Sequence, residues 1–216
     1  QTIYNRAVDY NGMSYWVGVT SLQPDAKGLT YSNAANWQVS ADDAASLGKS
    51  ILLAENTYYN QVYASLDDAK FVNALYRNLG GTDADPGGLA YWLGKLQILE
   101  TPGTSLQTAR ASMVGSFVRD LISTDLTKFI DVLTTEQMTD AVHRQAAVVN
   151  KLAVSLAYES VSAGSGGAIF NAQAVGDAAF NAEVRLMNSV NTDPSTVSTA
   201  IIGIYNAVTH QDLSLI

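Results

Sequence analysis

Asp85–Pro–Gly–Gly–Leu–Ala–Tyr–Trp92 is the stretch that decides the fold, because an earlier copy of it reads Asp9–Tyr–Asn–Gly–Met–Ser–Tyr–Trp16. The copies begin 76 positions apart (85 − 9) and keep Asp, Gly, an aliphatic residue and Tyr-Trp at the same spacing. Internal repeats of this kind are typical of modular helical arrays. We therefore predict an all-α chain that contains helical repeat units.

Helical spacing dominates the rest of the sequence, and strand-like alternation is weak. Apolar residues recur every three or four positions in segments that open with capping residues, such as Ser65 and the Asp85-Pro86 pair. The pattern predicts helices over 41–54, 65–80, 85–96, 105–123, 135–162, 171–189 and 194–209.

The long helix over 135–162 carries one apolar stripe, which we expect to face the core: Met138, Val142, Ala146, Val149, Leu152 and Leu156. Residues 134–216 lack the Tyr-Trp element. We therefore predict two parts, with two Tyr-Trp-containing helical repeats in residues 1–125 and a C-terminal helical bundle in residues 126–216.

Composition excludes several classes of function. Of the 216 residues 47% are hydrophobic and only 15% are charged, and the net charge is −8 with no cluster of Lys or Arg. A nucleic-acid groove is therefore not expected. The absence of cysteine excludes disulfides, thiolate metal sites and cysteine nucleophiles. No apolar run approaches the roughly 20 residues that span a bilayer, so we expect no transmembrane segment.

The repeated motif has a structural interpretation that needs no ligand. Each Asp caps a helix, each Gly permits a tight turn, and the aliphatic residue and the Trp insert into the core. The residues in these structural roles are Asp9, Gly12, Trp16, Asp85, Gly88, Leu89 and Trp92. The alternative interpretation is that flat rings beside polar side chains form platforms for a neutral polysaccharide. The candidate rings are Tyr15, Tyr31, Trp37, Tyr58, Tyr59 and Tyr91.

Metal-binding and catalytic residues are sparse. Asp83 and Asp85 are weak candidates for a calcium site, because two carboxylates one residue apart can share a hard cation. The terminal bidentate acid of a calcium loop is absent, so helix capping is the preferred interpretation. The two histidines, His143 and His210, have no second ligand at metal-binding spacing, and no Gly-x-Ser-x-Gly motif occurs. We therefore expect no enzymatic activity and no cofactor, with calcium as the one possible ion.

Phe71–Val–Asn–Ala–Leu–Tyr–Arg–Asn–Leu–Gly80 followed by Gly88–Leu–Ala–Tyr–Trp92 resembles a bacterial helical repeat family named as a domain of unknown function. The resemblance covers roughly residues 1–125. It implies an extracellular address, because such repeats are found in S-layer proteins, RTX-type exoproteins and adhesins that are typically exported by type I secretion. It implies no catalytic residues.

These observations favour an extracellular structural protein of the bacterial cell surface, S-layer-like or filament-forming, or the cell-anchoring region of a larger exoprotein. Its expected partner is a further copy of itself, because a low fraction of charged residues lets neighbouring copies approach with little electrostatic repulsion. One alternative is an adhesin module that binds polysaccharide or lipopolysaccharide. The other is a small secreted enzyme, for which His143 or His210 would have to converge with a carboxylate and a hydroxyl.

Overall fold

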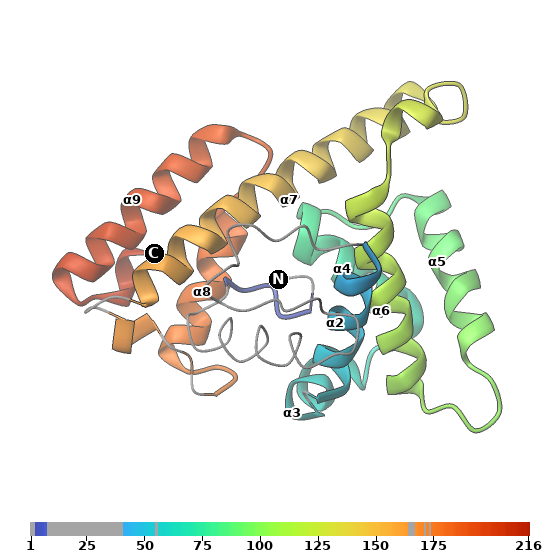
Figure 1. Cartoon of the computed structure of the whole chain (residues 1–216), viewed down its shortest axis with the longest axis horizontal. Helices are drawn as coiled ribbons and strands as arrows, with labels where there is room; N and C mark the ends of the chain where they lie inside the picture. Colours follow the sequence, from blue (N-terminus) through green and yellow to red (C-terminus); the bar gives the residue numbers. More distant parts are fainter. Residues whose placement is uncertain (1–2, 8–40, 55, 164–166, 171, 173) are drawn as a thin grey trace.

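The chain folds into an assembly of α-helices, which confirms the all-α prediction. The computed structural model describes residues 3–7, 41–54, 56–163, 167–170, 172 and 174–216, and within these ranges it contains helices and no strand. Figure 1 shows the long helix α7 crossing the molecule diagonally between two groups of helices. The helices are α2 (Ala41–Ala54), α3 (Asn56–Tyr58), α4 (Asp68–Gly80), α5 (Pro86–Leu99), α6 (Leu106–Ser123), α7 (Thr135–Ser162), α8 (Ala178–Ser189) and α9 (Pro194–His210).

Four short helical segments complete the described elements. One is π-helical and three are 3-10 helices: η2 (Tyr59–Tyr63), η3 (Leu126–Phe129), η4 (Gly167–Phe170) and η5 (Leu213–Leu215). None of the described helices has the length and hydrophobicity that crossing a bilayer requires.

Most helix starts follow from local capping chemistry. Asp85 caps α5 with Pro86 in the first turn, and Ser105 caps α6, as the sequence predicts. The long helix α7 begins with a reciprocal capping box between Thr134 and Gln137, so its N-cap lies one residue before the start of the predicted helix over 135–162. These side chains satisfy backbone N–H groups that have no partner inside the helix.

Two helix starts differ from the prediction. The N-cap of α4 is Asp67 rather than Ser65, and its carboxylate accepts the Lys70 N–H at 2.8 Å. Helix α8 begins at Ala178 instead of 171, because the Asp177 carboxylate accepts the Phe180 N–H at 2.8 Å and fixes the start there. In both cases a carboxylate close to the apolar run caps the helix.

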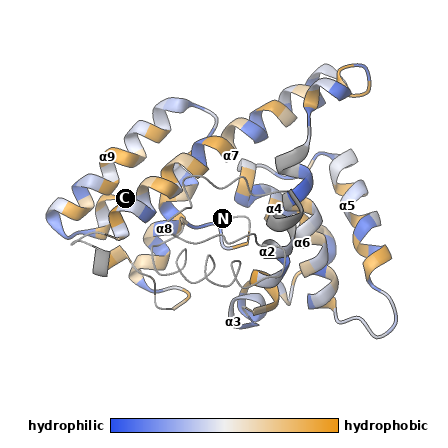
Figure 2. Ribbon diagram, viewed as in Figure 1, coloured by the Kyte–Doolittle hydropathy of each residue, from blue (hydrophilic) through white to orange (hydrophobic). Residues whose placement is uncertain are grey.

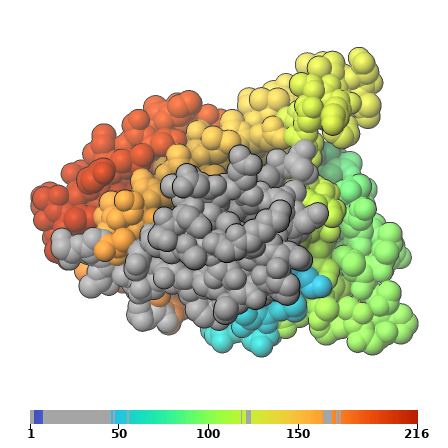
Figure 3. All heavy atoms as spheres, in the orientation of Figure 1, coloured from blue at the N-terminus to red at the C-terminus, as the bar shows by residue number. Residues whose placement is uncertain are grey.

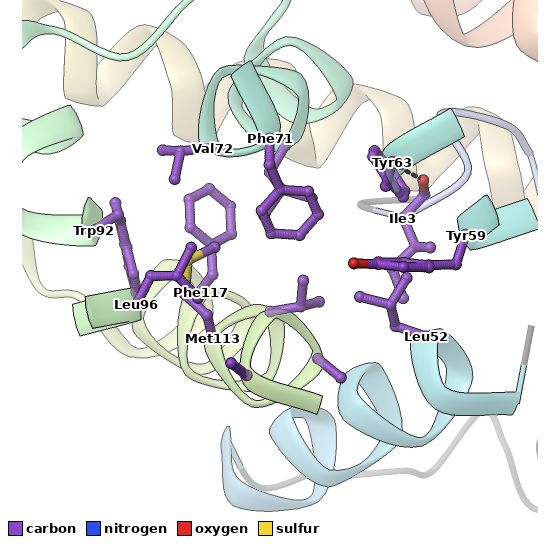
Figure 4. Packing of buried hydrophobic residues seen from close by; sticks show 14 of the residues in the cluster. Ile3, Leu52, Tyr59, Tyr63, Phe71, Val72, Trp92, Leu96, Met113 and Phe117 are labelled. Atoms are coloured by element: carbon purple, nitrogen blue, oxygen red, sulfur yellow. Dashed lines mark hydrogen bonds between the residues drawn. The ribbon is translucent and has the colours of Figure 1, made fainter. Parts of the chain in front are cut away.

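The first buried cluster lies where α4, α5 and α6 meet α2 and η2. One face of α4 is buried through Phe71, Val72, Leu75, Tyr76 and Leu79. In Figure 4 the Phe71 ring points into the interior between Tyr63 on one side and Phe117 of α6 on the other. The Tyr63 hydroxyl donates a hydrogen bond to the Ile3 carbonyl, which attaches the N-terminal segment to this cluster.

A buried arginine fastens α6 to the start of α4. Arg110 is 1% exposed and donates to the Tyr63 carbonyl at 2.9 Å and the Leu66 carbonyl at 2.7 Å. It also forms an ion pair with Asp68 at 2.8 Å and lies over the Phe71 ring, 4.7 Å from the centroid. Burying a charge costs much less when the charge is paired and hydrogen-bonded, and Arg110 meets both conditions.

The second buried cluster joins the C-terminal half of α7 to α8 and α9. Its centre includes Val154 and Tyr158 of α7, Leu186 of α8 and Ile204 of α9. The Tyr158 hydroxyl donates to the Phe170 carbonyl at 3.1 Å, so the ring is buried without an unpaired polar group. Helix α7 therefore contributes to the packing of α4 through its first half and to this cluster through its second half. The predicted division into residues 1–125 and 126–216 stays a prediction.

The orientation of α7 is the main departure from the sequence analysis. Four residues of the stripe predicted to face inward are exposed instead: Val142 (49%), Val149 (64%), Leu152 (54%) and Leu156 (50%). The buried face carries Ala147, Lys151, Val154, Ser155 and Tyr158. The inward prediction is therefore wrong for these four positions. Hydrophobic residues recur along α7 in Figure 2, and Figure 3 shows atoms of α7 and α9 together on the surface.

Candidate functional site

The described copy of the Tyr-Trp motif opens α5 and ties it to α7. One oxygen of the Asp85 carboxylate accepts the Gly88 N–H at 3.0 Å, and the other forms an ion pair with Arg144 of α7 at 3.3 Å. Asp85 therefore caps α5, as the structural interpretation of the motif predicts, and its ion pair also links α5 to α7.

Trp92 is a core residue. It is 6% exposed, and its ring lies 5.0 Å from Phe117 and 5.0 Å from Tyr91, centroid to centroid. Figure 4 shows Trp92 and Leu96 directed from α5 toward Phe117 and Met113. Such aromatic contacts contribute beyond the area that they bury. Leu89, one turn earlier, is partly buried against the same cluster.

Gly88 has a different role from the one predicted. It lies in the first turn of α5 and is not among the described glycines with positive φ, so it does not form a tight turn. A Cβ added at this position would lie 2.7 Å from the Tyr76 hydroxyl oxygen. The motif therefore needs glycine because the tyrosine of α4 approaches the α5 backbone closely.

Tyr91 borders an aromatic pocket between α4, α5, α6, η3 and α7. The ring is 49% exposed, and the Lys95 ammonium lies 5.3 Å from its centroid. The pocket has a volume of about 390 Å³. Its lining combines aromatic rings with polar side chains, including Tyr76, Tyr91, Trp92, Phe117, Phe129, Asp120, Thr124, Arg144 and Gln145.

This arrangement suits a ligand with both apolar faces and hydroxyl groups. Rings can lie against the C–H faces of a sugar, while a carboxylate, a hydroxyl and an amide can bind its hydroxyls. Burial raises the pKa of Tyr76, and the Arg144 guanidinium lowers it in part, so the phenol stays protonated and can donate at neutral pH. Of the three predicted platform residues that the structure describes, Tyr58, Tyr59 and Tyr91, only Tyr91 lines this pocket.

Tyr58 and Tyr59 are buried, each 5% exposed, so the prediction that they form exposed platforms is wrong. The Tyr58 ring packs edge-on against Tyr4 at 4.7 Å and Tyr63 at 5.6 Å. Burial raises the pKa of Tyr58. Both tyrosines belong to the first buried cluster.

The remaining predicted site residues lie outside the described part of the chain. They are the platform candidates Tyr15, Tyr31 and Trp37 and the first motif copy with Asp9, Gly12 and Trp16. The predicted equivalence of the two repeat units therefore stays a prediction.

The two calcium candidates are engaged by arginines. Asp83 forms an ion pair with Arg77, and Asp85 forms one with Arg144. Among the residues that the structure describes, no three acidic or histidine side chains gather closely enough to hold a metal ion. The positions of these carboxylates are thus accounted for by helix capping and pairing with arginine.

The two histidines lie on different helices. His143 of α7 and His210 at the end of α9 are both exposed, and a ring nitrogen of His210 lies 2.9 Å from the Asn206 carbonyl oxygen of its own helix. No described carboxylate forms an ion pair with either ring. A catalytic constellation of the kind required for the enzyme alternative is not formed by these described residues.

The exposed stripe of α7 is a second candidate site, which the sequence analysis placed in the core. Val142, Val149 and Leu156 recur every seven residues, and Leu152 lies between the last two at the position that a coiled-coil seam uses. The periodicity of these residues indicates an apolar face on the helix, but it does not indicate whether that face is buried or exposed to solvent.

A family model matches part of the chain. Residues 51–101 match the family described as Domain of unknown function (DUF4214). The matched range contains α4, the Tyr-Trp motif and α5, and the description assigns no activity. No curated protein and no solved structure matches the chain.

Proposed function

We propose that this protein is a structural component of the bacterial cell surface that self-associates through the exposed stripe of α7. The observation that carries the proposal is that four large aliphatic side chains, each about half or more exposed, lie on the face of α7 opposite its buried face. An apolar stripe of this kind marks a contact surface more often than an isolated exposed residue does.

The stripe has the geometry of a helix–helix seam. Its large residues follow a heptad spacing, and the positions beside them hold small residues such as Ala146 and Ala153. The charged residues of this stretch, Arg144 and Lys151, are mostly buried on the opposite side. A second copy can therefore approach the stripe without placing like charges together, although each copy carries a net charge of −8.

The expected strength of one such contact is modest. Fully burying an aliphatic side chain contributes roughly 1.5–3 kcal/mol, so completing the burial of a half-exposed one contributes about 1 kcal/mol. Eight such side chains in a pair give about 8 kcal/mol, from which association subtracts roughly 4–15 kcal/mol. One seam alone predicts weak dimers, and a stable assembly needs several contacts per copy. That combination suits a lattice or filament.

The test is the concentration dependence of the molar mass, measured by sedimentation velocity from about 10 μM to about 1 mM, the range of a weak contact. We expect growth beyond the monomer in the wild type and its loss in Leu152→Glu/Leu156→Glu. Ile130→Glu is the matched control, because Ile130 is 65% exposed but lies outside the stripe. Wild-type protein that stays monomeric at every concentration refutes the proposal.

The proposed location is the outer surface of a Gram-negative cell after type I secretion. The lack of cysteine and the low fraction of charged residues support it, because a chain without cysteine needs no oxidative folding. Antibody labelling of intact producing cells tests the location. Labelling that requires permeabilised cells refutes it.

A second candidate function is polysaccharide or lipopolysaccharide binding, which the aromatic pocket at Tyr91 favours. Tyr91→Ala should weaken retention on cell-surface polysaccharide at unchanged thermal stability. Tyr205→Ala is the matched control, because Tyr205 is 61% exposed on α9, away from the pocket. Equal retention of both variants and the wild type rejects this pocket as the glycan site.

A further inference from the structure

A polar cleft lies on the side of α7 opposite the exposed stripe. Its volume is about 850 Å³, within the range of small-molecule sites. The C-terminal end of α4, the buried side of α7 and the connection between α8 and α9 enclose it. Its lining is rich in amides, hydroxyls and cations, among them Asn5, Asn188, Asn191, Thr192 and Lys151.

Lys151 is the buried cation of this cleft. It is 2% exposed, and its ammonium donates one hydrogen bond, at 3.0 Å, to the carbonyl oxygen of Asn78 near the end of α4. An ammonium has three N–H donors, so the helix end uses one of them. Desolvation lowers the Lys151 pKa from 10.5 to about 8, which still leaves the side chain mostly charged at neutral pH.

No carboxylate in the described part of the chain forms an ion pair with Lys151. Asp83 and Asp85 are paired with Arg77 and Arg144. Asp140, the acid that lines the cleft, lies eleven residues before Lys151 on the same helix, about 16 Å along the axis at 1.5 Å per residue. Buried charges in proteins are normally paired, so this ammonium lacks a counter-charge that an anionic ligand can supply.

Asn5 gives a second, independent indication of a ligand. Its amide nitrogen donates to the Asn188 side-chain oxygen at 2.8 Å, whereas its own side-chain oxygen is buried and has no hydrogen-bond partner among the described residues. A buried acceptor without a donor is costly, and both residues line the cleft. The missing group is a donor, such as a hydroxyl.

We propose that the cleft binds a small hydroxyl-bearing anion, whose carboxylate or phosphate pairs with the Lys151 ammonium and whose hydroxyl donates to the Asn5 side-chain oxygen. Arg77 and Arg144 also line the cleft, but each is paired with an aspartate, so Lys151 is the cation that is left to bind the anion. The threonine hydroxyls and the Asn191 amide add further polar groups for a hydroxylated molecule. This site shares Arg144 with the Tyr91 pocket, but neither Lys151 nor Asn5 lines that pocket, and the proposal does not depend on self-association.

The experiment is calorimetric titration of the whole protein with four probes: glucuronate, glycerol 3-phosphate, inorganic phosphate and neutral glucose. We expect glucuronate or glycerol 3-phosphate to bind at least about tenfold more tightly than glucose, since each carries the charge that Lys151 lacks. The comparison of these two probes identifies whether carboxylate or phosphate is preferred. Inorganic phosphate should bind more weakly than glycerol 3-phosphate, because it brings no alcohol hydroxyl to Asn5.

Three variants complete the test. Lys151→Met should weaken binding of the charged probe at least about tenfold. Asn191→Asp places a negative charge at the exposed rim without disturbing the core, and should weaken the charged probe in the same direction. Lys128→Met, an exposed lysine on η3, should bind as the wild type does.

Several results overturn the proposal. The proposal fails if neither charged probe binds, or if glucose binds as tightly as the charged probes do. It also fails if Lys151→Met and Asn191→Asp both bind with wild-type affinity while circular dichroism shows them folded. Inorganic phosphate binding as tightly as glycerol 3-phosphate, together with no binding of glucuronate, contradicts the role assigned to Asn5.

Discussion

The buried Lys151 should make the stability of the protein rise with pH in a window where few other groups titrate. Its pKa is about 8 in the folded state, against 10.5 for the free side chain, so the unfolded chain binds more protons between these values. The free energy of unfolding then increases with pH. As the pH rises, Lys151 becomes neutral in the folded state, which no longer carries the cost of burying a charged ammonium. Integrated from pH 7 to 9.5, the expected gain is about 2 kcal/mol.

The measurement is urea unfolding of the wild type and Lys151→Met at half-unit pH steps, in buffers without phosphate or carboxylate. Titration stops at pH 9.5, because burial raises the pKa of Tyr63 in the folded state and its contribution has the opposite sign above pH 10. The wild type should gain about 2 kcal/mol relative to the variant across this window. Parallel pH profiles for the two proteins would mean that Lys151 is not desolvated, and the argument for an unpaired buried cation would fail.

Three stability predictions test the packing around the motif. Arg110→Met removes the donors to the Tyr63 and Leu66 carbonyls and to the Asp68 carboxylate. It should cost about 3–5 kcal/mol and lower the midpoint of thermal unfolding by about 10 °C. Gly88→Ala should cost about 1–3 kcal/mol through the close tyrosine hydroxyl. Gly94→Ala in the same helix meets nothing within 4 Å and should stabilise by up to about 1 kcal/mol. Trp92→Ala should cost about 3–5 kcal/mol, whereas Tyr91→Ala should cost under about 1 kcal/mol. Equal melting temperatures within either pair would contradict the contacts described.

Helix identity and most helix ends were predictable from the sequence because the signals are local. A capping side chain reaches only two or three residues along the chain, so the Asp85-Pro86 pair and Ser105 mark their helices directly. Where two acceptors compete, the sequence alone does not decide between them. Ser65 and Asp67 are both possible caps, and the structure uses the carboxylate.

The candidate site was less predictable because its features depend on contacts between distant segments. Nothing near Gly88 in the sequence indicates that the hydroxyl of Tyr76 lies against it. Tyrosine is equally suited to a core and to a surface, which is why Tyr58 was interpreted as exposed and Tyr91 could not be distinguished from it.

The two faces of α7 explain why its apolar stripe was wrongly predicted to face the core. They also allow self-association and anion binding to be tested independently. Periodicity identifies an apolar face but not what covers it, so the stripe with Leu152 was assigned to the core. The actual core face contains Lys151 and Ser155, polar residues that periodicity assigns to solvent, and it is able to bury them because the end of α4 and the neighbouring helices offer polar partners. Lys151 thus belongs to the buried face of α7, whereas the adjacent Leu152 belongs to its exposed face. Leu152→Glu should abolish self-association and leave anion binding intact, and Lys151→Met should do the reverse. A variant set in which both properties fail together would show that α7 itself, not its separate faces, had been disrupted.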